Sequence, residues 1–370
     1  MVISHLRRLK NMFLVLILMQ LFTSLSLSFV GFFFKEQGFS LWSLILLNAL
    51  LVGVGCVSVL VVRVIYVKRF WLIGIFLHSV LLFLLAYFRP MISYAGDFII
   101  LGVNMLFFWL PCNYLFFTRS SKETNAMDAF LYLVAPGFLA ILLPPFGAWI
   151  INTYGYGKLF YLSGVLYVIP LLVAWRYFEE EKCEMNFKRE FREFRGLKTI
   201  TLLEGALHFF AMLIIPVYAL LFLKTEMEVG WFLSYMAVVS FVMGFMVSRY
   251  SDMKQQRTLP IFVLFFLLTM ATLGLYLVKT LFMWYVMVGI FTVFNTISSP
   301  LRLAISMDVK EVNMGFWRIR EFFLNAGRVV TLGLSAVLFY YEWYGVVFGL
   351  FAGLMLMYPF LMRYKLRELR

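Results

Sequence analysis

One charged segment divides the chain, and it reads Arg176-Tyr-Phe-Glu-Glu-Glu-Lys-Cys-Glu-Met-Asn-Phe-Lys-Arg-Glu-Phe-Arg-Glu-Phe-Arg-Gly-Leu-Lys198. Six apolar stretches precede it, approximately residues 12–34, 41–62, 70–88, 98–117, 129–151 and 159–175, and six follow it, approximately residues 200–223, 231–247, 259–277, 281–305, 322–340 and 344–361. A hydrocarbon core about 30 Å thick takes about 17 to 25 helical residues, and backbone polar groups in lipid must bond within each segment. The sequence therefore predicts an all-α polytopic membrane protein with twelve transmembrane helices in two pseudo-symmetric six-helix bundles.

The expected domains follow from this division. Residues 1–175 are predicted to form an N-terminal bundle, residues 176–197 a cytoplasmic linker and residues 198–370 a C-terminal bundle. Equal halves of this kind build many secondary transporters, with a ligand site between them. Within the linker, Phe187, Phe191 and Phe194 recur at helical spacing among basic residues. This spacing predicts an amphipathic helix on the inner leaflet, with a flexible charged linker as the alternative.

Composition and charge agree with a membrane protein. Hydrophobic residues make up 63% of the chain and charged residues only 14%, against about 25% charged in ordinary soluble domains. The net charge of +13 raises the question of nucleic acid or acidic lipid, with anionic lipid contact as a minor contribution. With the N-terminus inside, however, the outer ends carry only Lys35, Arg89, Lys158, Lys224 and Lys279. The positive-inside rule then places both termini in the cytoplasm, so the charge indicates orientation.

The expected partners follow from that orientation. We predict a multi-pass protein of the cell (plasma) membrane that contacts the lipid bilayer and a small-molecule substrate, binds no nucleic acid and is a monomer. The three cysteines, Cys56, Cys112 and Cys183, have no disulfide or metal-ligand spacing. No glycine-rich phosphate loop followed by Lys-Ser or Lys-Thr occurs in the cytoplasmic segments. Neither a metal nor a cofactor is therefore expected.

Three segments resemble one transporter family. After the eighth apolar stretch comes Ser248-Arg249-Tyr250-Ser251-Asp252-Met253-Lys254-Gln255-Gln256-Arg257, which resembles the G-x-L-x-D-R-x-G-R-R loop of the major facilitator superfamily. Asp252 and Arg257 match this pattern, whereas Ser248, Met253 and Gln255 depart from it. Pro144-Pro-Phe-Gly-Ala148 in span five is similar to the family's G-P-x-x-G-G segment. Arg320-Glu321-Phe-Phe-Leu-Asn-Ala-Gly-Arg328 resembles the opening of span eleven in prokaryotic members.

The resemblance implies two bundles that rock around a central site, with a cytoplasmic latch. In that latch, Asp252 is expected to face the start of span five, near residues 125–127. The matching loop of the first half, residues 60–70, has no acidic residue and departs from the family pattern. The residues to which we assign coupling or gating roles are Glu204, Arg249, Asp252, Arg257, Arg320, Glu321 and Arg328.

Polar residues within the spans suggest a transport path. Such groups are costly in lipid, so they are expected to face a cavity or another helix. In the resembled family, helices one, four, seven and ten line the central cavity. The substrate-cavity candidates on these helices are Gln20, Ser24, Asn104, Asn113, His208, Asn295, Ser299 and Arg302.

Each candidate also has a structural alternative. Serines in helices bond back to their own backbone, and a lone buried histidine can serve helix packing. Asn104 and Asn113 are nine positions apart, roughly 180° around a helix, so both face one cavity only if Pro111 kinks the segment. Arg302 and Arg328 could bind an anionic group, or could snorkel or pair with Asp308, Glu311 or Glu321.

The sequence gives less information about the energy source and the substrate. No Asp or Glu is embedded in the first six spans, so Glu204 is the best proton candidate and facilitated diffusion is the alternative. A secondary transporter working by alternating access is the leading interpretation, ahead of a membrane-embedded enzyme and of a lipid flippase or scramblase. The 43 phenylalanines and 21 methionines suit efflux of hydrophobic compounds. Transport of a sugar or a small organic anion is the alternative.

Overall fold

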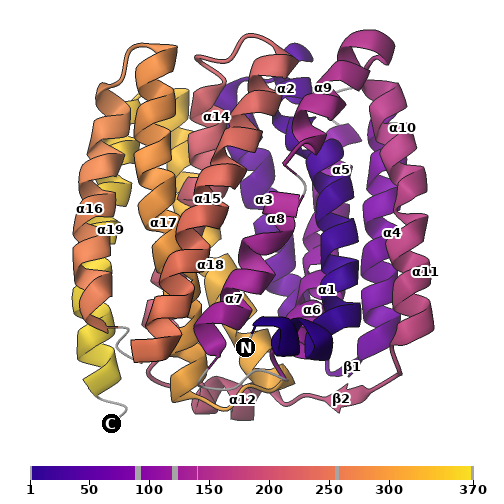
Figure 1. Ribbon diagram of the computed structural model, residues 1–370, viewed down its shortest axis with the longest axis vertical. Helices are drawn as coiled ribbons and strands as arrows, with labels where there is room; N and C mark the ends of the chain where they lie inside the picture. Colours follow the sequence, from indigo (N-terminus) through magenta and orange to yellow (C-terminus); the bar gives the residue numbers. More distant parts are fainter. Residues whose placement is uncertain (1, 88–92, 119–123, 140, 255–257, 368–370) are drawn as a thin grey trace.

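Twelve helical passes run side by side through the molecule (Figure 1). The computed structural model describes residues 2–87, 93–118, 124–139, 141–254 and 258–367. Among these, eleven helices are long and apolar enough to cross a membrane, and a twelfth has a shorter apolar part at Ile261–Leu277. These findings confirm the all-α fold with twelve spans.

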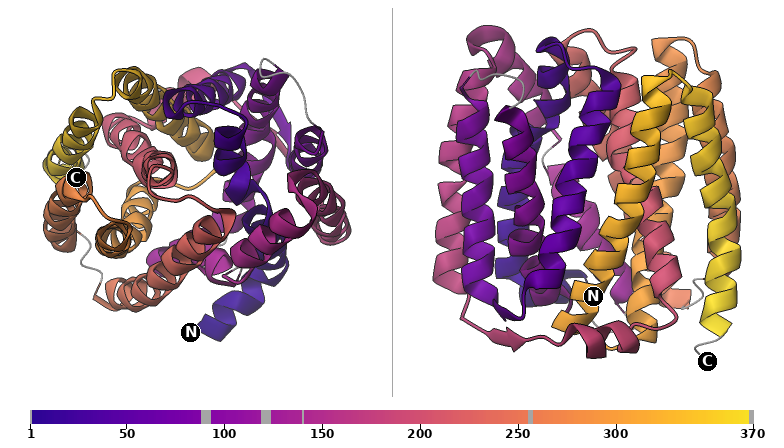
Figure 2. Two further views of the ribbon diagram at one scale, coloured as in Figure 1. Left: turned by 90° about the horizontal axis from the view of Figure 1, so that it is seen from above. Right: turned by 180° about the vertical axis from the view of Figure 1, so that it is seen from behind.

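The first six passes are, in order, α1–η1–α2 (Val2–Leu25, Leu27–Phe29, Val30–Glu36), α3 (Leu41–Val61), α4 (Val67–Leu85), α5–η2–α6 (Ser93–Asn104, Met105–Trp109, Leu110–Phe117), α7–α8–α9 (Asn125–Leu133, Ala135–Leu139, Leu143–Tyr154) and α10–α11 (Tyr156–Leu166, Val168–Tyr177). The last six are α13–η3–α14 (Lys198–Phe209, Phe210–Ile214, Ile215–Ala219), α15 (Glu226–Lys254), α16 (Thr258–Leu277), α17 (Leu281–Val309), α18 (Met314–Tyr340) and α19 (Tyr344–Arg367). The view from above shows the two halves side by side (Figure 2).

The two ends of the molecule can be told apart by the chain termini. Helix α1 begins and α19 ends at the same end, at the bottom of Figure 1. We call this end the terminal face and the other end the opposite face. The linker elements also lie at the terminal face (Figure 1).

Spans four and seven share a local distortion that follows from proline. Each contains a five-residue π-helical segment, Met105–Trp109 and Phe210–Ile214, and each has Pro111 or Pro216 two positions after that segment ends. Proline has no amide proton and clashes with the preceding turn, so the regular hydrogen-bond ladder is interrupted there. The π-turn absorbs this interruption and changes which way the following residues face.

The linker is structured and contacts both halves. Strand β2 (Lys182–Glu184) pairs antiparallel with β1 (Val64–Tyr66), which lies between α3 and α4. Helix α12 (Phe187–Glu193) then packs its aromatic face on α18, with ring contacts from Phe187 to Phe322 and from Phe191 to Phe323. The predicted amphipathic helix is present, but this aromatic face covers protein rather than lipid.

The eleventh span is longer than the sequence indicates. Hydropathy begins it at residue 322, whereas α18 begins at Met314. The additional turns carry Arg318, Arg320 and Glu321, each at most 8% exposed. Hydropathy counts these charged residues as part of a loop, so it places the start of the span after them.

Candidate functional site

Two glycines bring α13 and α18 into unusually close contact. A Cβ atom at Gly205 would lie 2.0 Å from the carbonyl oxygen of Leu324, and one at Gly327 would lie 1.9 Å from that of Leu202. Neither position therefore has room for a side chain. Small residues at membrane-helix interfaces allow such backbone approach. The crossing sets the charged residues of α13 beside those of α18.

We expect Gly327→Ala to separate these helices and destabilise the protein by about 1 to 3 kcal/mol, the usual cost of overpacking. The clash is with a backbone carbonyl, which cannot swing away as a flexible side chain can. Thermal unfolding of the purified protein measures this cost. Gly333→Ala on the same helix is the matched control, because a Cβ atom at Gly333 would meet no other atom within 4 Å. Equal melting temperatures for the two variants would contradict the close crossing.

A cluster of five buried charges lies at this crossing. Arg320 on α18 donates from Nη2 to Glu204 Oε1 on α13 at 2.8 Å. Arg328 Nη1 lies 3.9 Å from Glu321 Oε2 and donates to Asn325 Oδ1 at 2.7 Å. The fifth member is Arg302 of α17, which lies within electrostatic range of His208 together with Arg320 and Arg328, and all five residues are at most 8% exposed.

The cluster carries an excess of positive charge. Its guanidinium groups are those of Arg302, Arg320 and Arg328, whereas its carboxylates are those of Glu204 and Glu321. Among the described residues, the Nε atoms of all three arginines are buried without a hydrogen-bond partner. A buried donor without a partner costs about 1 to 3 kcal/mol. The site therefore offers both unbalanced positive charge and unused donors to an anionic group.

Arg302 is the least neutralised of the three arginines. Its guanidinium carbon lies 5.7 Å from the ring centre of Phe265 and 6.0 Å from that of Tyr358. No ion pair with Asp308, Glu311 or Glu321 is found for it in the described part of the chain. Aromatic faces attract a cation but do not cancel its charge. One sequence-based alternative paired Arg302 with an acidic residue, whereas in the structure its guanidinium lies over two aromatic rings.

The cluster reaches His208 and the N-terminal half. Arg328 Nη2 lies 3.3 Å from His208 Nδ1. On the other side, Asn113 of α6 donates from Nδ2 to Glu321 Oε1 at 3.0 Å, and Tyr132 of α7 donates its hydroxyl to Asn113 Oδ1. Two predicted cavity residues, Asn113 and His208, thus join two predicted gating residues at the contact between the halves.

Other predicted cavity residues are placed elsewhere. Asn104 turns into the N-terminal bundle and contacts His78 Nδ1 at 2.8 Å, on the other side of the π-turn from Asn113. Gln20 donates to Ser24 at 3.1 Å, within α1. Asn295 and Ser299 on α17 are half-buried, and no side-chain bond joins them to the cluster among the described residues. The structure therefore gathers seven of the predicted residues, namely Arg302, Arg320, Arg328, Glu204, Glu321, Asn113 and His208, but not the full set.

The predicted latch is only partly visible. Arg249 is exposed on α15. The side chain of Asp252 and all of Arg257 lie outside the residues described. At the start of span five, Asn125 Nδ2 donates to Asp308 Oδ1 of α17 at 2.8 Å. This bond joins the two halves near the terminal face.

Sequence analysis did not single out Arg318, which is 1% exposed. Its guanidinium donates to the carbonyl oxygens of Val59 at 2.9 Å and Leu60 at 3.0 Å, at the end of α3. It also contacts Glu190 Oε2 of α12 at 3.2 Å. An arginine within a membrane helix is itself a functional signal. Here it joins both halves and the linker at the terminal face.

Contacts between the halves also occur at the opposite face. Lys35 of α2 donates from Nζ to Leu223 O at 3.4 Å and also to Leu220 O, just after α14. Within the membrane span, Ser234 of α15 donates to Ile141 O, between α8 and α9. With Arg318 and Asn125 at the terminal face, the two halves are therefore held together at both ends.

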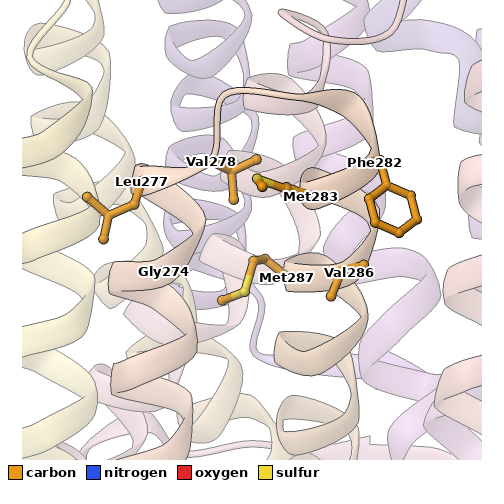
Figure 3. Close-up of a pocket in the computed structure, with 7 residues that line it drawn as sticks. All are labelled: Gly274, Leu277, Val278, Phe282, Met283, Val286 and Met287. Atoms are coloured by element: carbon orange, nitrogen blue, oxygen red, sulfur yellow. The ribbon is translucent and has the colours of Figure 1, made fainter.

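An apolar cavity of about 300 Å³ lies apart from this cluster (Figure 3). It sits between the end of α16 and the start of α17, and Phe282 at its edge is 78% exposed. Met287, on its wall, precedes Arg302 by fifteen positions, which is about 22 Å along a helix. The cavity is therefore not part of the charged site.

Comparisons with known proteins agree with this architecture. The family model described as Major Facilitator Superfamily matches residues 129–317, about half of the chain. Among solved structures, the human organic anion transporter MFSD10 (TETRAN) superposes with a TM-score of 0.70 at 12% identity, covering 97% of this chain and 99% of that chain. No curated protein matches the sequence. On its helical architecture and the family match, the chain belongs to the major facilitator superfamily.

Proposed function

We propose that this protein is a secondary transporter of a small organic anion, not an enzyme, and that the anion binds beside Arg302. The observation that carries the proposal is the buried excess of guanidinium groups over carboxylates. Burying an unbalanced charge is costly unless a partner compensates it. An anionic group supplies that partner, and a guanidinium can hold a carboxylate by two parallel hydrogen bonds.

Alternating access is the mechanism that these contacts favour. Arg318 and Asn125 bridge the halves at the terminal face, and Lys35 bridges them at the opposite face. Opening either face requires breaking one set while the other holds, which is what a rocking movement around a central site needs. The charged cluster lies on the contact between the halves, where an anion would be exposed to each side in turn.

Reconstitution into liposomes tests the proposed function against a lipid flippase. The protein should exchange a radiolabelled organic anion across the membrane faster than protein-free liposomes do. It should leave a fluorescent phospholipid in its starting leaflet. Lipid translocation without solute exchange would contradict the proposal.

Proton coupling is open to a test at Glu204. We expect Glu204→Gln to abolish accumulation driven by a pH gradient while anion exchange persists, because an amide can hydrogen-bond but cannot titrate. The neutral amide also leaves Arg320 uncompensated, which should tighten anion binding rather than remove it. Accumulation that survives the substitution would indicate facilitated diffusion or another coupling group.

Cysteine labelling tests the orientation of the protein in the membrane. We propose that the terminal face is cytoplasmic, in the plasma membrane of the cell. In a background lacking Cys56 and Cys112, an impermeant maleimide should label Gly96→Cys from outside intact cells and native Cys183 only after lysis. A side chain at Gly96 meets nothing within 4 Å, and burial raises the pKa of the Cys183 thiol, so Cys183 needs a long reaction. Labelling of Cys183 in intact cells would invert the orientation.

Three sequence-based expectations stay predictions. These are the likeness to prokaryotic members, a monomeric state, and efflux as the direction of transport. Hydrophobic cargo also stays a prediction, and none of the residues that line the apolar cavity in Figure 3 belongs to the charged cluster.

A further inference from the structure

A second apolar groove lies along the outside of α3, near the terminal face. Its volume is about 690 Å³, and its walls come from α3 and the residue after it, between Leu50 and Val62, together with Val103 of α5 and Leu106 of η2. Val57 and Val61 in this face are 60% and 72% exposed. An apolar surface on a membrane-spanning segment faces the acyl chains of lipids.

The length of this groove matches one leaflet. From Leu50 to Val62, twelve positions of helix cover about 18 Å. Half of a hydrocarbon core about 30 Å thick is about 15 Å. The groove therefore accommodates an acyl chain that enters from the terminal face and ends near the bilayer centre, rather than a molecule that spans both leaflets.

Basic residues gather where the groove reaches the terminal face. Arg63 follows the last groove residue and is exposed, and its carbonyl accepts a hydrogen bond from Met185 N at 2.9 Å. That bond places Met185, two residues before α12, beside the end of the groove. Lys188 and Arg192 are exposed one helical turn apart on α12. Among the described residues, no carboxylate pairs with any of the three.

The packing of α12 sets the depth of these charges. Its aromatic residues are turned onto α18 and Glu190 onto Arg318, so Lys188 and Arg192 lie on other faces of the helix. A helix held at the membrane surface in this way presents its basic residues at the level of lipid phosphates. The exposed carboxylate of Glu193 is already 3.7 Å from Arg189.

We propose that this groove is a binding site for an anionic phospholipid of the leaflet at the terminal face. One acyl chain lies along α3 between Leu50 and Val62, and the phosphate lies among Arg63, Lys188 and Arg192. The site is separate from the charged cluster, and it does not depend on the transported substrate. Each basic residue near a membrane surface strengthens anionic lipid binding about fivefold.

Native mass spectrometry of the full-length protein tests this site, with phosphatidylglycerol and phosphatidylcholine of identical acyl chains as probes. Wild type should retain phosphatidylglycerol in preference to phosphatidylcholine. Val57→Trp, which fills the groove, should lose both lipids. Val263→Trp on α16 is the matched control because Val263 is 58% exposed, and it should bind as wild type does.

A triple substitution separates the headgroup from the acyl chain. Arg63→Gln with Lys188→Gln and Arg192→Gln should remove the preference for phosphatidylglycerol and keep phosphatidylcholine. All three side chains are exposed, so the variant should melt at the wild-type temperature. Equal retention of both lipids by wild type, or equal lipid loss in Val57→Trp and Val263→Trp, would overturn the proposal.

Discussion

Arg302→Gln should weaken binding of an organic anion by about 30-fold or more, because removing one partner of a buried charge pair costs about 2 to 5 kcal/mol. Binding of the neutral amide of the same compound should change little. Arg302 is the cluster arginine without a carboxylate partner among the described residues, so an anion has most to gain there. Arg302→Lys keeps the charge but loses the planar fork of donors, so its affinity for the anion should lie between those of wild type and Arg302→Gln.

The control for this prediction is another arginine stacked on a ring. Arg363 of α19 lies 6.0 Å from the ring centre of Phe262 and is exposed. Arg363→Gln removes a similar stacking contact outside the cluster and should leave both affinities unchanged. Equal weakening of the anion and the amide by Arg302→Gln would make Arg302 a gate or packing residue. Scintillation binding with the purified protein measures both affinities.

Arg318→Gln should open the terminal face. The substitution leaves Glu190 and two carbonyls at the end of α3 buried without their partner, and breaking a buried pair in this way costs about 3 to 5 kcal/mol. Because Arg318 joins α18 to α3, most of that cost falls on the closed arrangement of this face. Spin labels at Tyr177→Cys and Glu311→Cys, one in each half, should report a longer distance than in wild type.

Two comparisons make this result specific. Adding Glu190→Gln to Arg318→Gln removes the stranded carboxylate and should partly restore the wild-type distance, since both partners are then gone. Arg69→Gln breaks the ion pair with Glu180 at 3.0 Å, but these side chains are 71% and 31% exposed. An exposed pair contributes about 0 to 1 kcal/mol. The distance between the spin labels should therefore not change in Arg69→Gln. An unchanged distance in Arg318→Gln would contradict the bridging role.

The spans could be predicted from the sequence because lipid imposes one simple requirement on each of them. A run of about twenty apolar residues can be recognised whatever their order, so the number of helices follows from hydropathy. The start of α18 could not be found in this way. Arg318, Arg320 and Glu321 resemble loop residues until their partners are known, and those partners come from α3, α12 and α13.

The site was predictable in its residue types but not in its pairing. Charges within membrane spans pointed to Glu204, Arg320 and Arg328 as residues of interest, but not to their contacts with one another. Which of them meet depends on the crossing at Gly205 and Gly327, and nothing in the spacing of either helix reveals the other. Asn104 illustrates the converse, because the π-turn after it sends this side chain to His78 while Asn113 faces the other half.

The sequence-based interpretation of the linker was correct for its helix and incomplete for its contacts. Aromatic residues at helical spacing predict an apolar face, but they do not say whether lipid or protein covers it. In the structure, Phe187 and Phe191 lie on rings of α18. The ion pair of Glu190 with Arg318 explains why this face turns inward, because the same rotation buries both.

The central claim is that unbalanced buried positive charge selects an anion for transport. Counterflow in proteoliposomes tests it most directly, with a carboxylate and its neutral amide of the same size measured in parallel. We predict saturable counterflow of the carboxylate and none of the amide above protein-free liposomes. Equal counterflow of the two compounds would contradict the claim.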